Sequence, residues 1–391
     1  MTTRTTRIGR GHGFARQLEW SEYKHKLLKN YLHVWCYKLG AFHQELAFVD
    51  TCAGAGKYAD GTSGSPLIAA AYNEDKAMVE RGTAMTVYAF ETDCEVFPSL
   101  VRNLASYSSR TPPRALVSSA SFFDNPRPVL DATRAMPTLF FIDPFGTEEI
   151  TWDRLRPVIT DGNRVSTELL VRIDPTMLAR YAGWVRRQSR TQTPVRGAAA
   201  FARLLERLNV DTEQIGVEAT IRDGSQSAKN AFLSQYLELY TSSFQYVQVV
   251  PIRASYAAAP KYMIVHATDN AHGAAHLNDV ASKLEDTLYT TTEERKDAAI
   301  GQGSLFGPPQ RSPRYSQAQL DHETYALIER LKRPAFIDLR AELAAYFGPE
   351  FREKDHKGAV KRLIEAGRVE AVGHVTTFEA NTVLRIKPSR T

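Results

Sequence analysis

The stretch F-F-I-D-P-F-G, residues 140–146, combines residue types that can do chemistry on an amine. It includes an apolar run typical of a buried strand, after which Asp143, Pro144 and Phe145 supply a carboxylate, a rigid turn and an aromatic ring. A carboxylate and a nearby carbonyl can accept hydrogen bonds from a nucleobase amine and aim its lone pair, while the ring stacks on the base. We therefore predict a catalytic role for Asp143, Pro144 and Phe145. The alternative is a sharp loop in which Asp143 only ends the strand.

A glycine-rich segment, D-T-C-A-G-A-G-K-Y, follows the apolar run 46–49. Glycines at this place let the backbone approach a ligand closely. The spacing differs from G-x-G-x-x-G, which argues against a dinucleotide site. We expect cofactor contacts from Asp50, Ala53, Gly54 and Gly56.

Further acids follow the next two predicted strands. Glu91 ends the second strand, where a carboxylate can accept hydrogen bonds from ribose hydroxyls. Asp93 is the second choice for this role, and it can equally cap a helix. Asp124 lies after the third strand, where an adenine edge would lie, although it can instead cap a turn with Asn125 and Pro126.

The elements that must position these residues alternate along the chain. Predicted strands cover residues 46–49, 85–90, 115–117, 138–142 and 166–173, and predicted helices cover residues 66–79, 94–107, 128–134 and 152–159. This alternation predicts an α/β fold with a parallel, Rossmann-like sheet covered on both faces. An amphipathic helix at 20–39 precedes the first strand, and residues 246–252 and 261–266 are expected to form an antiparallel pair that completes the sheet.

Domain boundaries follow from composition. We expect residues 1–300 to form the α/β domain with its N-terminal helix and an Arg-rich helical insertion near 175–240. Glycine and proline mark residues 301–315 as a linker. Residues 316–391 contain three predicted helices, 325–331, 337–346 and 354–366, and then alternating segments at 368–372 and 382–386. Three helices followed by a hairpin are typical of a C-terminal winged-helix domain.

Besides the basic N-terminal arm, basic residues gather in two segments that can bind nucleic acid, although the formal net charge is only +5. The first lies in the insertion and the second on the third helix of the winged-helix domain, where a recognition helix would meet a major groove. The predicted nucleic-acid contacts are Arg186, Arg187, Arg190, Lys354, Lys357, Lys361 and Arg362. Each cluster can also be a solvated helix face, and winged helices also dock proteins.

Several classes of protein are excluded by the sequence. No apolar run is long enough to span a bilayer, and the basic N-terminus lacks the apolar core of a secretory signal. Cys36, Cys52 and Cys94 are odd in number and lack C-x-x-C spacing, so neither disulfides nor a metal site is predicted. We expect a protein of a reducing, cytoplasmic compartment.

The order of these motifs resembles that of S-adenosylmethionine-dependent methyltransferases. D-P-F-G resembles the D-P-P-Y class of amino-methyltransferase motifs and, more closely, the form in tRNA guanine N2-methyltransferases. D-T-C-A-G-A-G-K-Y, the G-S-P of residues 64–66, F-I-D-P-F-G and the C-terminal domain together resemble the three-Cys-motif partner family. That resemblance implies S-adenosylmethionine as cofactor, a bacterial source and a partner protein with a three-cysteine, radical-enzyme-like motif. The single Pro144 departs from N/D-P-P-Y, which leaves the target amine open.

One short motif falls in the predicted linker. Gln302, Leu305 and Phe306 resemble the pentapeptide Q-L-S/D-L-F by which bacterial DNA-processing proteins dock on the sliding clamp, with Gly303 departing from the pattern. A flexible linker suits a docking peptide. The alternative is an ordinary linker.

The sequence supports an enzyme that methylates nucleic acid, with DNA favoured over RNA and a base exocyclic amine as the acceptor. The competing hypothesis is a non-methylating, DNA-binding partner subunit of a three-Cys-motif protein in DNA repair or defence. A small-molecule methyltransferase is a third option, against which the basic insertion and the C-terminal domain argue.

Overall fold

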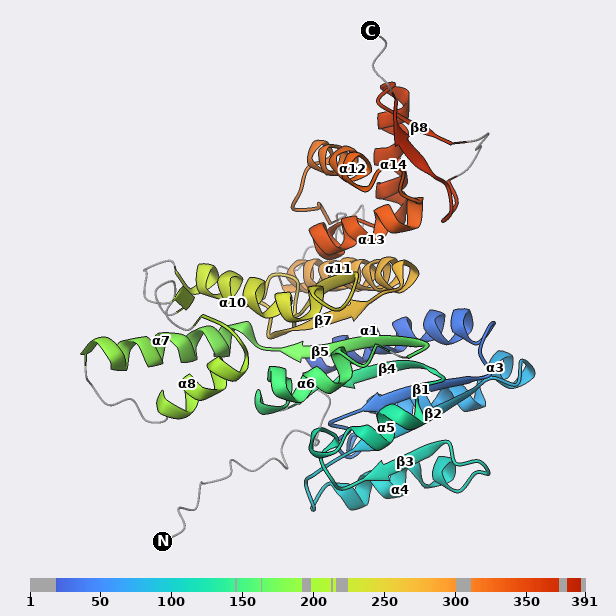
Figure 1. Ribbon diagram of the computed structural model, residues 1–391, viewed down its shortest axis with the longest axis vertical. Coiled ribbons are helices and arrows are strands. Elements are labelled where there is room, and N and C mark those ends of the chain that lie inside the picture. Colours follow the sequence, from blue (N-terminus) through green and yellow to red (C-terminus); the bar gives the residue numbers. More distant parts are fainter. Residues whose placement is uncertain are drawn as a thin grey trace. The chain divides into compact units, whose positions relative to one another are not determined.

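Figure 1 shows the computed structural model, whose elements form two compact units, residues 1–145 with 161–166 (unit 1) and residues 146–160 with 167–391 (unit 2). The described residues are 19–144, 146–162, 164–191, 198–211, 214–215, 224–299, 311–372 and 378–387. Among them, seven strands belong to one sheet with the order β3-β2-β1-β4-β5-β7-β6. The predicted α/β fold class with a mostly parallel sheet is confirmed.

Unit 1 contains four parallel strands. They are β1 (Glu45–Asp50), β2 (Ala84–Phe90), β3 (Ala115–Ser118) and β4 (Pro137–Ile142), in the order β3-β2-β1-β4. Three of them, β1, β2 and β4, are buried on both faces, whereas the edge strand β3 is partly exposed at Leu116. The near-continuous apolar sequences of these three strands match this double burial, because strands covered on both faces have no solvent-facing side. The helices of this unit are α1 (Glu19–Leu39), α2 (Ser65–Ala70), α3 (Lys76–Glu80), α4 (Phe97–Ser108) and α5 (Arg127–Ala132).

The prediction of one continuous helix over residues 66–79 is wrong. The structure has two helices there, α2 and α3, separated by a 3₁₀ turn at Ala71–Glu74. The side chain of Asn73 explains the break, since it donates to the carbonyl of Met85 at 2.8 Å and accepts from the Met85 amide at 3.0 Å. Asp75 then caps α3 by accepting from the amide of Met78 at 3.2 Å. The Asn73 side chain, which hydrogen-bonds to strand β2, therefore prevents α2 and α3 from forming one helix.

Unit 2 carries the antiparallel part of the sheet. Strand β7 (Tyr262–Thr268) pairs antiparallel with both β5 (Ser166–Ile173) and β6 (Tyr246–Ile252), so the predicted antiparallel pair is confirmed. The helices α6 (Trp152–Ile159), α7 (Pro175–Thr191), α8 (Ala198–Arg207) and α10 (Gly224–Thr241) also belong here. The rings of Tyr181 and Phe201 stack with centroids 4.1 Å apart and join α7 to α8 within the predicted Arg-rich insertion.

Helix α11 (Ala271–Ala299) is 29 residues long and was not predicted. Its buried side includes the polar residues Asn278, Ser282 and Glu285, which mask the apolar periodicity by which a helix is recognised. Figure 1 shows α13 (Phe336–Phe347) running beside α11, and Arg340 of α13 pairs with Asp279 of α11 at 2.7 Å. Polar contacts rather than an apolar stripe therefore hold part of this interface.

The C-terminal segment has three helices and a two-stranded antiparallel sheet, in the predicted order. These elements are α12 (Gln317–Leu331), α13, α14 (Glu353–Glu365), β8 (Val369–Ala371) and β9 (Leu384–Ile386). Ser316 and Gln319 form a capping box that starts α12. Leu327, Leu343 and Leu363 lie in a shared buried core of the three helices. None of the described helices is both long and apolar enough to cross a membrane.

Candidate functional site

Asp50, at the end of β1, is completely buried. Its Oδ1 accepts a hydrogen bond from the amide of Cys52 at 3.2 Å, whereas its Oδ2 has no hydrogen-bond partner among the described residues. Burial raises the pKa of Asp50 to about 7, although the Ser65 hydroxyl and the Cys52 amide act in the opposite direction. The first strand therefore ends in a carboxyl group that lacks the solvation an ionised group needs.

The loop after Asp50 requires glycine at two positions. Gly54 has a φ of +59° and Gly56 a φ of +73°, both in the left-handed region that side chains disfavour. A Cβ on Gly56 would lie 3.1 Å from the side chain of Leu100 on α4, and one on Gly64 would lie 2.9 Å from the carbonyl oxygen of Gly56. The predicted glycine loop is thus a close-packed turn with little room for added atoms on its inner side.

Two hydrogen bonds fix this loop to neighbouring elements of unit 1. The amide of Ala53 donates to the carbonyl of Phe90 on β2 at 2.8 Å, and Nδ2 of Asn103 on α4 donates to the carbonyl of Ala55 at 2.8 Å. Loops that bind a ligand through their backbone have to be held in place before the ligand arrives. This loop meets that requirement.

Glu91 is buried at the carboxyl end of β2, and its Oε1 accepts a hydrogen bond from the amide of Asp93 at 2.7 Å. The side chain of Asp93 accepts in turn from the amide of Glu95 at 2.9 Å. Asp124 is exposed in a 3₁₀ turn, Phe122–Asp124, after β3. The Glu91 carboxylate is therefore held in place, Asp93 contacts its own turn, and Asp124 is exposed to solvent.

Asp143 follows β4, and its Oδ2 forms a salt bridge with Nζ of Lys24 on α1. The two side chains are 13% and 9% exposed, so the pair is largely shielded from water. Nζ of Lys24 also lies 5.8 Å from the centre of the Phe141 ring. Pro144 is buried. Phe145 lies outside the described residues, so its predicted stacking role stays a prediction.

The contribution of α1 to this site was missed by the sequence analysis. His25 is buried beside Lys24, and its ring lies 5.7 Å from that of Tyr58. Burial, followed by the charge of Lys24, holds the pKa of His25 well below its usual value. Burial and the Asp143 carboxylate raise the pKa of Tyr58 to about 12. The signal that could have found Lys24 is its position on the apolar stripe of Leu27 and Leu28, where a charged residue needs a partner.

Three acids thus lie at the carboxyl ends of three neighbouring parallel strands of unit 1. Asp50 is the last residue of β1, Glu91 and Asp143 directly follow β2 and β4, and β1 pairs with both β2 and β4. The carboxyl ends of parallel strands meet at one edge of the sheet, which is where open α/β sheets bind ligands. This edge can accept hydrogen bonds from hydroxyl groups and stabilise a ligand that carries positive charge.

The predicted nucleic-acid residues differ in their surroundings. On α14, Lys354 and Lys361 are exposed, whereas Lys357 pairs with Glu353 at 2.6 Å and Arg362 with Asp321 at 2.6 Å. On α7, Arg187 is exposed and Arg186 is buried. The side chain of Arg190 and the peptide residues Gln302, Leu305 and Phe306 lie outside the described part of the chain. Lys354, Lys361 and Arg187 are therefore the predicted cations that face solvent.

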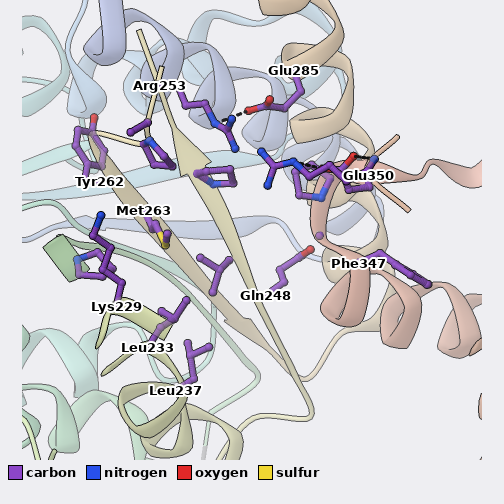
Figure 2. Close-up of a pocket in the computed structure, with 18 of the residues that line it drawn as sticks. Lys229, Leu233, Leu237, Gln248, Arg253, Tyr262, Met263, Glu285, Phe347 and Glu350 are labelled. Carbon is purple, nitrogen blue, oxygen red and sulfur yellow. Dashed lines mark hydrogen bonds and ion pairs between the residues drawn. The ribbon is translucent and has the colours of Figure 1, made fainter. Parts of the chain in front are cut away.

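A separate cavity of about 910 Å³ lies within unit 2 and shares no lining residue with the predicted cofactor set. Figure 2 shows Leu233 and Leu237 of α10 on one side and Gln248 of β6 near its middle. Arg253 is buried with its Nε 3.8 Å from Oε1 of Glu285, and the dashed line in Figure 2 marks this pair. The cavity mixes apolar walls with paired charges, and no predicted site residue reaches it.

The chain matches no protein-family model and no curated protein. Solved structures give distant likenesses. The methyltransferase domain of bacterial CtHen1-C is 10% identical with a TM-score of 0.31, over 62% of this chain and 98% of that one. A candidate S-adenosylmethionine-dependent methyltransferase from Listeria monocytogenes is 12% identical with a TM-score of 0.29, over 64% and 98% of the two chains. A cyclopropane-fatty-acyl-phospholipid synthase-like protein from Lactobacillus casei is 9% identical with a TM-score of 0.25, over 63% and 92%. Similarity at this level does not assign a function to this chain.

Proposed function

We propose that this protein is an S-adenosylmethionine-dependent methyltransferase that acts on nucleic acid. The observation that carries the proposal is the set of acids Asp50, Glu91 and Asp143 at the ends of adjoining strands, together with the glycine turn after β1. The cofactor supplies an activated methyl group on a sulfonium cation. The ribose hydroxyls, ammonium group and sulfonium of this cofactor fit an edge that offers buried carboxylates and a close-packed backbone turn.

Each residue would have a distinct role in holding the cofactor. Glu91 would accept hydrogen bonds from the ribose hydroxyls, because the Asp93 amide already fixes its carboxylate. Asp50 would face a positive group, since its buried Oδ2 has no other hydrogen-bond partner among the described residues. The backbone of Gly54 and Gly56 would allow close approach, and Ala53, Asp93 and Asp124 would complete the site.

Asp143 would accept a hydrogen bond from the target amine and orient its lone pair, with Pro144 fixing the turn and Phe145 stacking on the base. The target amine would be a base exocyclic amine, in DNA rather than RNA. The C-terminal segment would act as a winged helix, with Lys354 and Lys361 of α14 reaching phosphates. Arg187 of α7 would make a separate phosphate contact.

The same motifs support membership of the three-Cys-motif partner family and a cytoplasmic, bacterial setting. A protein bearing the three-Cys motif would be the partner, and the peptide around Gln302, Leu305 and Phe306 would dock on the sliding clamp. The sequence resemblances support these assignments. A pull-down with the purified partner or clamp, against a variant in which Leu305 and Phe306 are both replaced by Ala, tests the peptide.

A second candidate function is favoured by the Lys24 salt bridge to Asp143. An Asp143 whose Oδ2 already accepts a hydrogen bond from the chain's own lysine has fewer acceptor positions left for a substrate amine. This observation supports a non-methylating subunit that binds DNA for a partner enzyme in repair or defence.

Calorimetric titration with S-adenosylmethionine and S-adenosylhomocysteine separates the two candidates. Micromolar binding is expected, and Glu91→Gln should weaken it by about ten- to hundredfold, because a charged hydrogen-bond acceptor contributes about 1.5–3 kcal/mol. The matched control is Glu95→Gln, an exposed acid of the same loop that should leave affinity unchanged. Absence of binding together with retained affinity for duplex DNA would support the partner subunit instead.

A further inference from the structure

The Lys24 amine occupies the place that the proposed mechanism gives to a substrate amine. Its Nζ donates a hydrogen bond to Oδ2 of Asp143, the carboxylate after β4 that would orient a methyl acceptor. We propose that Lys24 is itself a methyl acceptor, so that the protein methylates its own N-terminal helix. This inference rests on the proposed function, because the methyl donor is S-adenosylmethionine.

The position of Lys24 sets it apart from the other lysines of the chain. Among the described residues it is the one lysine that is buried, at 7% exposure, whereas its neighbours Lys26 and Lys29 on the same helix are exposed. A buried lysine is uncommon, because its amine loses water contacts that protein groups must replace. Here the replacement comes from the Asp143 carboxylate and the face of the Phe141 ring.

Strand pairing places this amine beside the proposed cofactor edge, because Asp50 of β1 pairs with Phe141 of β4, two residues before Asp143. The charges of Lys24 and Asp143 both act on Asp50, the former lowering its pKa and the latter raising it. Asp50 is the carboxyl group expected to face a positive group of the cofactor. The amine, the orienting carboxylate and a cofactor-binding residue therefore form one electrostatic cluster.

The reaction is balanced without any further reagent. Lys24 Nζ gives up a proton to the Asp143 carboxylate, from which it passes to solvent. The freed lone pair forms a bond to the methyl carbon, and the carbon–sulfur bond breaks with its electrons left on sulfur. The products are methyl-lysine and S-adenosylhomocysteine. Because the neutral amine takes the methyl group from a sulfonium cation, the product forms directly as a methylammonium. It keeps its positive charge and two N–H donors, so it can restore the salt bridge to Asp143.

Mass spectrometry tests the proposal directly. The full chain, first checked for methylation as purified, is incubated with S-adenosylmethionine that carries a trideuterated methyl group, and is then digested with a protease that cleaves after acidic residues. Label is expected on Lys24, at a rate that does not change with protein concentration. Lys24→Arg should abolish the label, and Asp143→Asn should slow labelling by about 100-fold or more, as loss of a proton acceptor does.

The matched control is Lys26→Arg, which replaces an exposed lysine of the same helix and should leave labelling intact. Thermal unfolding of Lys24→Arg shows whether the variant remains folded. Calorimetry with S-adenosylhomocysteine on the same wild-type sample distinguishes the two hypotheses. Cofactor binding without label on Lys24, or equal labelling of exposed lysines, would overturn self-methylation and leave the proposed function standing. Absence of cofactor binding would overturn both.

Discussion

Nε2 of His266 lies 3.3 Å from Oε2 of Glu168, and both side chains are almost completely buried. Nε2 of Gln248 lies 3.1 Å from Nδ1 of His266 and donates to the carbonyl of Ala274 at 2.8 Å. Because an amide nitrogen can only donate, Nδ1 of His266 accepts and Nε2 carries the hydrogen that points to Glu168. A polar chain therefore crosses β5, β7 and β6 inside unit 2.

Replacing His266 should show how much this row of buried polar side chains contributes to the free energy of unfolding. His266→Leu removes a donor from a buried carboxylate and should lower the free energy of unfolding by about 3–5 kcal/mol, as measured by urea denaturation. The double variant Glu168→Leu, His266→Leu removes both polar groups and should recover most of this loss. A single variant as stable as the wild type would show that His266 does not stabilise Glu168.

Asp50 should make cofactor binding depend on pH. Burial raises its folded pKa to about 7 from a usual value of 3.8, so a positive group that binds beside it must first displace a proton at lower pH. Affinity for S-adenosylmethionine should fall about tenfold per pH unit below 7, and the binding enthalpy at pH 6 should vary with the ionisation heat of the buffer. Asp50→Asn should abolish both effects, while an unchanged buffer dependence in the variant would assign the proton to another group.

The same shift has a consequence for stability without ligand. Since the folded pKa of Asp50 lies above the unfolded one, its contribution is favourable at low pH and is lost as the pH rises from about 4 through 7. Asp50→Asn should therefore be more stable relative to the wild type at pH 8 than at pH 5. Thermal unfolding at the two pH values measures the difference.

His356 on α14 should make the C-terminal helices sensitive to acid. It is 1% exposed, and neither ring nitrogen has a hydrogen-bond partner among the described residues. Burial, and then the charge of Arg340, lowers its pKa from 6.5 to about 3. As the pH falls below 6.5, His356 takes up a proton in the unfolded state while it stays neutral in the folded state. The free energy of unfolding therefore decreases.

At pH 5 this loss should amount to about 2 kcal/mol relative to neutral pH. His356→Leu should remove that part of the acid sensitivity in urea denaturation of the full chain. His322→Gln changes an exposed histidine on α12 and should leave the pH dependence as it is. Equal acid sensitivity in wild type and His356→Leu would show that other groups are responsible.

The exposed lysines of α14 should determine the salt dependence of DNA binding. Replacing both Lys354 and Lys361 by Ala should weaken duplex binding and reduce the slope of log affinity against log salt by about 2, because each phosphate contact contributes about 0.9. Fluorescence anisotropy over a salt series measures this slope. Lys76→Ala, at an exposed position on α3, is the control. An unchanged slope in the double variant would place the DNA on another surface.

Strands β1 to β7 and the order of the C-terminal elements were predicted from the sequence because their signals are local. The short apolar run Pro137–Ile142, which begins at a proline and ends before the Asp143-Pro144 turn, indicates a buried strand by its length and its flanking residues. The acids that end the strands were found in the same way, since the residue after an apolar run lies at the edge of a sheet. Helix α11 was not predicted, because its buried face carries the polar residues Asn278 and Glu285 and so lacks the regular spacing of apolar residues that marks a helix.

Tertiary structure alone decided what these acids contact. Asp143 and Lys24 are 119 residues apart in sequence, and no spacing rule joins them. The full burial of Asp50, the buried position of Arg186 and the polar chain through His266 likewise depend on elements brought together by folding. A sequence pattern shows how apolar residues repeat along a single helix or strand. Ion pairs and pKa shifts depend instead on burial and on distances between side chains of different elements, which only the folded chain determines.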